Sequence, residues 1–109
     1  MIPVPVEAIK NSKNAVVNDM PIVVKDIEIV NINGLHARPS AFFAKEASKF
    51  RSEIFVELGE MKVNGKSIMG LITLEASFGK ILHVTCDGDD AEDQMKAVEW
   101  VIKNFIVGE

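Results

Sequence analysis

Apolar residues recur with two different periods along this chain of 109 residues, and the change of period predicts its elements. From Lys25 to Ile29 polar and apolar residues alternate, which is typical of a half-buried strand. Further strands are predicted at Glu53–Leu58, Met61–Val63 and Lys80–Cys86. A turn that contains glycine follows each of these three, as expected for short strands that reverse direction.

Spacings of three and four residues between apolar side chains predict helices at Pro39–Phe50 and at about Ala91–Ile106. A short third helix is predicted at Ile68–Leu74, with Ser67 as its N-cap. The element order is therefore βαββαβα. This order predicts an α+β fold, an open-faced β-sandwich in which three helices cover one face of a four-stranded antiparallel sheet.

The first 21 residues differ from the rest, because they hold three of the four prolines and show no sustained periodicity. We interpret residues 1–21 as an N-terminal extension and residues 22–109 as one domain. A short strand at Ala15–Val17 is the alternative for part of the extension.

Composition narrows the class of protein. The net charge of −4 disfavours nucleic acid as the main partner, because phosphate neutralisation needs clustered lysine and arginine. The single cysteine, Cys86, has no second cysteine to pair with, which fits a reducing compartment. The sequence shows no signal peptide and no apolar run of the roughly 20 residues that a membrane span needs. These features predict a cytoplasmic protein with no membrane span.

The stretch NINGLHARPSA, residues 31–41, holds the candidate chemistry. His36 precedes the first turn of a predicted helix, where free N–H groups and the helix dipole favour an anion. Arg38 adds donors suited to phosphate oxygens, and a neutral imidazole is a nucleophile. The alternative is a capping or solvent-exposed histidine without chemistry. His83 lies mid-strand between Leu82 and Val84 with no matching acid, and we interpret it as structural.

Two segments resemble the HPr family of the bacterial phosphoenolpyruvate-dependent phosphotransferase system. Gly34–Ala41 (GLHARPSA) is similar to the family's active-site signature, and Asn64–Leu71 (NGKSIMGL) is similar to the segment of its regulatory serine. The likeness extends over about residues 22–107. It implies the same open-faced fold and a phosphoryl carrier rather than an enzyme, without cofactor or metal. His36 would take the phosphoryl group from Enzyme I, on Nδ1 as in the family, and pass it to Enzyme IIA domains. Arg38 would stabilise the phosphohistidine.

The resemblance also implies a second site and a docking surface. Ser67 would be phosphorylated by HPr kinase/phosphorylase where that enzyme exists, in addition to capping its helix. Phe42 and Met69 do not fit the buried stripes of their helices, and family members use the positions of Phe42, Ile68 and Met69 for partners. We expect a small apolar docking patch there, with ordinary edge packing as the alternative.

Trp100 also points away from the buried stripe of its helix, almost opposite Val98 and Ile102. An exposed tryptophan of this kind usually contacts something. The extension of residues 1–21 is the nearest candidate cover, and a homo-oligomer contact is the other.

Two competing functions remain. One is a regulatory binding protein of the same fold that acts through Ser67, including a regulator of the nitrogen-related branch. Relatives of the regulatory kind replace the active-site histidine, so the presence of His36 with Arg38 favours the carrier. The other is an enzyme that uses His36 as an acid or base, which is disfavoured because no motif supplies a paired catalytic group. The sequence does not choose between the sugar-transport and nitrogen branches.

Overall fold

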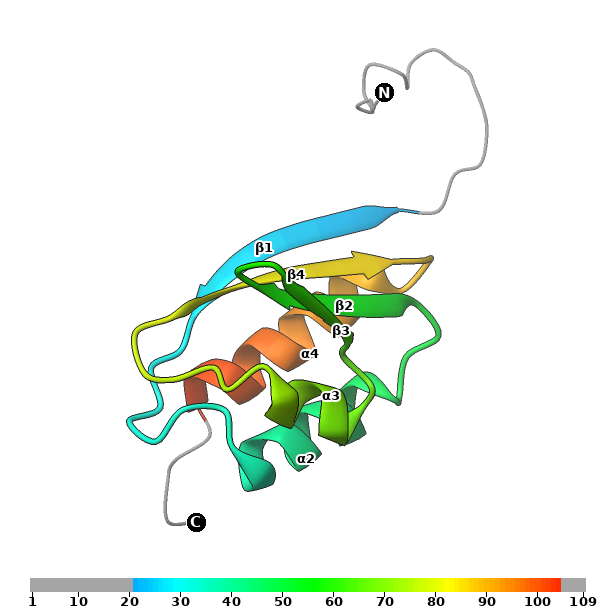
Figure 1. The fold of residues 1–109 in the computed structure, drawn as a ribbon. Coiled ribbons are helices and arrows are strands. Elements are labelled where there is room, and N and C mark those ends of the chain that lie inside the picture. Colours follow the sequence, from blue (N-terminus) through cyan, green and yellow to red (C-terminus); the bar gives the residue numbers. More distant parts are fainter. Residues whose placement is uncertain (1–20, 105–109) are drawn as a thin grey trace.

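The computed structural model describes residues 21–104, and its upper layer in Figure 1 is a four-stranded antiparallel sheet. The strands lie in the order β1-β4-β2-β3, so β1 and β3 are at the edges. Their bounds are Ile22–Glu28 for β1, Glu53–Leu58 for β2, Met61–Asn64 for β3 and Ile81–Asp87 for β4.

Three helices lie on one face of this sheet and leave the other face open (Figure 1). They are α2 (Ala37–Ala47), α3 (Ile68–Thr73) and α4 (Ala91–Asn104). The predicted βαββαβα order and the α+β open-faced sandwich are therefore confirmed. No helix within residues 21–104 combines the length and the apolar character needed to cross a membrane.

The core lies between the sheet and the helices. Antiparallel register places Ile27 opposite Leu82 and Val84 opposite Val56, so that the alternate side chains of each strand point toward the helices. The helices fill the other side of the core with the buried apolar residues on their sheet-facing sides. The fully buried side chains of helices α2, α3 and α4 include Phe43, Leu71, Val98 and Val101.

The predicted bounds of the first helix, Pro39–Phe50, were wrong at both ends. The helix begins at Ala37, because His36 takes the N-cap position, and it ends at Ala47. After Ala47 the chain tightens: the N–H of Phe50 donates to the carbonyl oxygen of Ala47, three residues back, at 3.1 Å. Phe50 therefore lies in a turn rather than on the helical stripe.

The last helix is described as far as Asn104, so the predicted end at Ile106 lies outside the described residues. Trp100 is 57% exposed on α4, which confirms that it lies off the buried stripe. The extension that was its candidate cover, and the alternative strand at Ala15–Val17, also lie outside the described residues.

His83 has an acidic partner that the sequence did not suggest. Asp26 on β1 lies directly opposite His83 on β4, and its Oδ1 is 2.7 Å from the Nδ1 of the imidazole. The expectation of no matching acid was wrong because the partner is 57 residues away in sequence. The pair is on the open face of the sheet, which supports a structural role for His83.

Candidate functional site

A tight turn holds the loop that leads from β1 into α2. The N–H of Gly34 donates to the carbonyl oxygen of Asn31 at 2.8 Å, and the N–H of Asn33 donates to the Asn31 side chain at 3.3 Å. Gly34 has a φ of +75°, a conformation that favours glycine. The next N–H, of Leu35, donates to the carbonyl oxygen of Ala76 at 2.7 Å. The loop is therefore fixed to the segment that follows α3.

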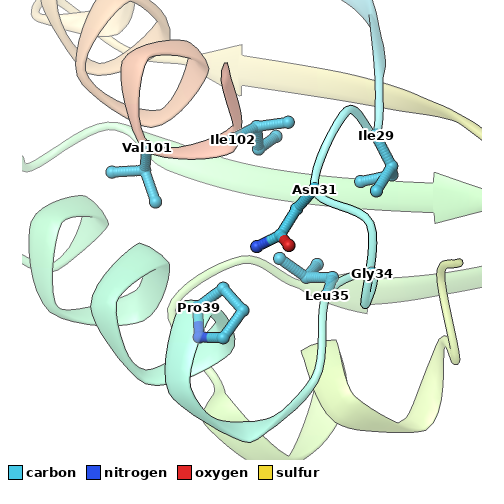
Figure 2. Close-up of a pocket in the computed structure, with 7 residues that line it drawn as sticks. All are labelled: Ile29, Asn31, Gly34, Leu35, Pro39, Val101 and Ile102. Carbon is cyan, nitrogen blue, oxygen red and sulfur yellow. The ribbon is translucent and has the colours of Figure 1, made fainter. Parts of the chain in front are cut away.

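The loop also packs on the last described turn of α4. Figure 2 shows a small hollow that Leu35 and Pro39 line from one side and Val101 and Ile102 from the other, with the amide of Asn31 between them. The hollow is narrow and mostly apolar, and His36 does not line it. The hollow therefore lies between the start of α2 and the last described turn of α4, and the exposed His36 lies outside it.

His36 is at the start of α2, with extended backbone angles of φ −92° and ψ −156°. Its carbonyl oxygen accepts the N–H of Ser40 at 2.9 Å, which begins the helix, while its side chain does not cap the helix. His36 and Arg38 are both exposed. Within residues 21–104, no hydrogen bond or ion pair occupies the imidazole of His36 or the guanidinium of Arg38.

The first turn of α2 favours an anion beside His36. Helix geometry leaves the N–H groups of Ala37 and Arg38 without intrahelical partners, and the turn contains no acidic residue to compensate the helix dipole. Ser40 is held in place, since its Oγ donates to the carbonyl oxygen of Leu35 at 3.1 Å. The site therefore combines an accessible nucleophile, a cation and helix N–H donors. In the described part of the chain, no group of three or more histidine, cysteine, aspartate or glutamate side chains is placed to hold a metal ion.

Ser67 is the N-cap of α3, as predicted. Its Oγ accepts the N–H of Gly70 at 3.0 Å. The preceding residue is also fixed: the Nζ of Lys66 donates to the carbonyl oxygen of Phe50 at 2.8 Å. The hydroxyl is therefore oriented by the start of a helix, in a partly exposed position.

The three residues expected to form a docking patch differ in exposure. Ile68 is 44% exposed and Met69 is 69% exposed, both at the start of α3. Phe42 is only partly exposed and packs against the core. Its side chain therefore also makes the ordinary edge packing that was the alternative to a docking patch. Helices α2 and α3 contact each other (Figure 1), so the exposed apolar side chains of α3 belong to the layer that also carries His36.

Sequence reasoning did not identify the contact that holds the loop of His36. Ala76 and Gly34 are far apart in sequence. Only the folded chain shows that the backbone of Ala76 leaves no room for a side chain at position 34. The Asn-Gly pair at positions 33–34 indicated the positive φ of Gly34, but nothing in the sequence indicated its contact with Ala76.

The structure is thus a small open-faced sandwich that presents an exposed histidine at a helix start, beside donors that suit an anion. Residues 23–104 match the family described as "PTS HPr component phosphorylation site". The chain is 43% identical over 81 residues to the phosphocarrier protein HPr of Neisseria meningitidis, an alignment that covers 74% of this chain and 91% of that protein. The chain therefore belongs to the HPr family of the phosphotransferase system, in which HPr itself is a phosphocarrier protein and not an enzyme.

Other relatives agree with this assignment. The HPr-like protein Crh of Halalkalibacterium halodurans is 43% identical over 77 residues, covering 71% of this chain and 92% of that protein. A crystal structure of HPr from Thermoanaerobacter tengcongensis superposes with a TM-score of 0.71 at 47% identity, covering 74% of this chain and 91% of that one. The similarity in structure therefore extends over the sheet and helices described above.

Proposed function

We propose that His36 accepts a phosphoryl group from Enzyme I, which phosphoenolpyruvate charges, and passes it to Enzyme IIA domains. The observation that carries this proposal is the exposed, unoccupied imidazole at the start of α2, with Arg38 two residues further on. A carrier has to present the same atom to a donor and then to an acceptor. An exposed helix start allows both proteins to approach, which a closed pocket would not.

The transfer is an exchange of bonds at phosphorus. A ring nitrogen of neutral His36 attacks the phosphorus carried by the donor, the bond between phosphorus and the donor breaks, and a phosphorus–nitrogen bond forms. A nucleophile of the acceptor then attacks the phosphorus, the phosphorus–nitrogen bond to His36 breaks, and the free imidazole is restored. Arg38 and the N–H groups at the start of α2 would stabilise the phosphoryl oxygens throughout the transfer.

The partners would dock on the exposed apolar residues of α3. Ile68 and Met69 are the most accessible members of the predicted patch, and the flexible Met69 side chain suits contact with more than one partner. Phe42 would contribute only its exposed part, since it also packs against the core. We place this exchange in the cytoplasm, as the single unpaired Cys86 and the family suggest.

Ser67 supplies the regulatory part of the proposal, as a substrate of HPr kinase/phosphorylase. A phosphate there would add roughly −1.5 to −2 charges at pH 7. It would be next to Ile68 and Met69, within the proposed docking surface. Docking of an acidic partner would then be weakened by charge repulsion.

A second candidate function is a regulatory binding protein of the Crh type, which would use the Ser67 face without carrying phosphoryl groups. Crh of H. halodurans is among the relatives, at 43% identity, and that observation favours keeping this candidate. The presence of both His36 and Arg38 favours the carrier. A role in the nitrogen-related branch is compatible with either candidate.

One experiment tests the carrier function. The protein is incubated with labelled phosphoenolpyruvate, magnesium and Enzyme I, and acid-labile phosphate on the protein is measured. We expect label on the wild type and on His83→Ala, which removes the other histidine, and none on His36→Ala. An unlabelled wild type, or equal label on His36→Ala, would overturn the proposal.

A separate reaction tests the regulation. With ATP and HPr kinase/phosphorylase, we expect an acid-stable phosphate that Ser67→Ala loses and His36→Ala keeps. Wild-type protein that stays unlabelled by an active kinase would contradict the proposed role of Ser67.

A further inference from the structure

Ser40 is the fourth residue of α2, and it is fully buried. Its Oγ donates to the carbonyl oxygen of Leu35 at 3.1 Å. Its backbone N–H donates to the carbonyl oxygen of His36 at 2.9 Å. One residue of the helix therefore binds the carbonyl groups of two consecutive residues, and the second of these is the exposed histidine.

The two carbonyl groups belong to the peptide units on either side of the His36 Cα. A peptide unit is planar, so a hydrogen bond to its oxygen restricts the rotation of the whole unit. The backbone between two such units has only the dihedrals φ and ψ, which are −92° and −156° at His36. Ser40 therefore restrains both backbone angles of His36, and with them the direction in which its side chain leaves the backbone.

The first of these peptide units is also bound to the rest of the fold. The N–H of Leu35 donates to the carbonyl oxygen of Ala76 at 2.7 Å, and Leu35 itself is buried. A helical backbone would bring a donor to the Leu35 oxygen from the residue four positions on, but that residue is Pro39, which has no N–H. The hydroxyl of Ser40 supplies the donor that Pro39 lacks.

The imidazole of His36 depends on this backbone for its position. Within residues 21–104, no hydrogen bond or ion pair holds the ring. The N–H groups of Ala37 and Arg38, which suit an arriving phosphoryl group, belong to the helix. Such donors stabilise a developing charge only when they are already in position, and a misplacement of about 1 Å can lower a rate by about 100-fold. The backbone of His36 is the link between the ring and these donors.

We propose that Ser40 is a positioning residue for phosphoryl transfer, which keeps the imidazole of His36 at a fixed place relative to the N–H donors of α2. This inference rests on the proposed carrier function of His36. The Ser40 hydroxyl is buried, so it acts through the backbone and not by contact with a partner. Its removal should therefore slow the transfer step and leave the docking of Enzyme I on Ile68 and Met69 unchanged.

Single-turnover transfer from phosphorylated Enzyme I separates these two effects. Ser40→Ala keeps the helix and loses only the hydroxyl. We expect its transfer rate at saturating protein to fall by about 5-fold or more, because the peptide unit before His36 is then free to rotate away from the productive orientation. The protein concentration that gives half of the maximal rate should stay at the wild-type value.

Ser52→Ala is the matched control for a general loss of stability. Ser52 is also buried, and its hydroxyl bonds to Asp90 and Gln94 at the start of α4. The loop of His36 packs instead on the last described turn of that helix. Ser52→Ala should therefore lower the midpoint of urea unfolding, as Ser40→Ala does, and keep the wild-type rate of transfer.

Amide hydrogen exchange of the unphosphorylated protein, followed by NMR, tests the hold on the backbone without any phosphoryl chemistry. In Ser40→Ala, the amides of Leu35 and of position 40 should exchange faster, after correction for the intrinsic rate of the new residue. The increase there should exceed the increase in the central strands β2 and β4, which report on global unfolding. Ser52→Ala should show no such local excess.

Three outcomes would overturn the proposal: a wild-type transfer rate in Ser40→Ala, an equal fall in rate in Ser52→Ala, or no local excess of exchange at Leu35 and position 40. Failure of the carrier function looks different, because the wild type would then take no phosphate from Enzyme I. A wild type that is phosphorylated at the same rate as Ser40→Ala would reject only the role of Ser40.

Discussion

Gly34 lies against the carbonyl oxygen of Ala76, so closely that a Cβ on Gly34 would be 2.6 Å from that oxygen. The neighbouring N–H of Leu35 donates to the same oxygen at 2.7 Å. The loop that presents His36 is therefore positioned by the segment that follows α3 as well as by its own turn. The accessibility of the imidazole depends on a contact between parts of the chain that are far apart in sequence.

Gly34→Ala should disturb both stability and function. The new Cβ would approach the backbone of Ala76, and alanine at a φ of +75° is strained by itself. Left-handed backbone costs a non-glycine residue about 1–2 kcal/mol, so the free energy of unfolding should fall by about 2 kcal/mol or more once the clash is added. Urea unfolding measures this loss, and the rate of phosphorylation by Enzyme I measures the displacement of His36.

Gly59→Ala is the matched control. Gly59 has a φ of +63°, yet no atom lies within 4 Å of a Cβ built on it. This variant should show the backbone cost alone, and its rate of phosphorylation should match that of the wild type. Equal losses of stability and rate in the two variants would show that the contact with Ala76 has no special role.

Arg38→Ala should slow phosphorylation of His36 by about 10-fold or more, which corresponds to the roughly 1.5 kcal/mol or more that a hydrogen bond to a charged group contributes. Stability should change little, because Arg38 is exposed and makes no ion pair within residues 21–104. The rate is measured with phosphorylated Enzyme I, and Lys45→Ala on the same helix controls for a general loss of positive charge. A rate in Arg38→Ala equal to that in Lys45→Ala would remove Arg38 from the site.

The sequence predicted the sheet and the helices because their patterns are local. Alternation at Lys25–Ile29 and the helical spacing after Pro39 depend only on which side of one element is buried. The end of α2 was predicted less well, because Phe50 leaves the helix in a turn that the apolar spacing alone does not reveal. The partner of His83 was missed for a related reason, since strand register across the sheet decides that Asp26 lies opposite.

For the candidate site as well, features that depend on local sequence were predicted and features that depend on distant contacts were not. His36 and Ser67 were singled out because each belongs to a short motif near the start of a predicted helix. The N-cap position was predicted for Ser67 but not for His36, whose helix begins two residues earlier than expected. The partial burial of Phe42 was not predictable from a helical wheel, because it depends on how α2 packs against the rest of the core. The contact between Gly34 and Ala76 was hidden for the same reason.

Two substitutions of Ser67 separate the effect of helix capping on stability from the effect of negative charge on transfer. Ser67→Ala removes the oxygen that accepts the N–H of Gly70 and should lower the free energy of unfolding by about 1 kcal/mol. Ser67→Asp keeps an N-cap oxygen and adds a negative charge, so it should stay near wild-type stability while its transfer rate falls. Urea unfolding and phosphorylation by Enzyme I are measured on both variants. A rate in Ser67→Asp no lower than in Ser67→Ala would argue against regulation through charge.

Asp90, which precedes α4, should make stability depend on pH in the acidic range. Hydrogen bonds from Ser52, mainly its side chain, and from the backbone N–H of Arg51 hold the pKa of Asp90 at about 2, below its ordinary value of 3.8. The backbone N–H groups of Arg51 and Ser52 are each 2.9 Å from one of its carboxylate oxygens. A lowered pKa means that the ionised form stabilises the fold, so the contribution is complete above about pH 4 and is lost as the pH falls toward 2.

Asp90→Asn should therefore unfold at a lower temperature than the wild type at pH 7, with a difference that narrows below about pH 4 and closes near pH 2. Asp89→Asn is the control, because within residues 21–104 Asp89 makes only an exposed ion pair with Arg51, and such pairs contribute little. Thermal unfolding followed by circular dichroism from about pH 2 to about pH 7 measures all three proteins. If the difference between Asp90→Asn and the wild type stayed constant across this range, the ionised carboxylate would not be what holds residues 51 and 52 to the start of α4.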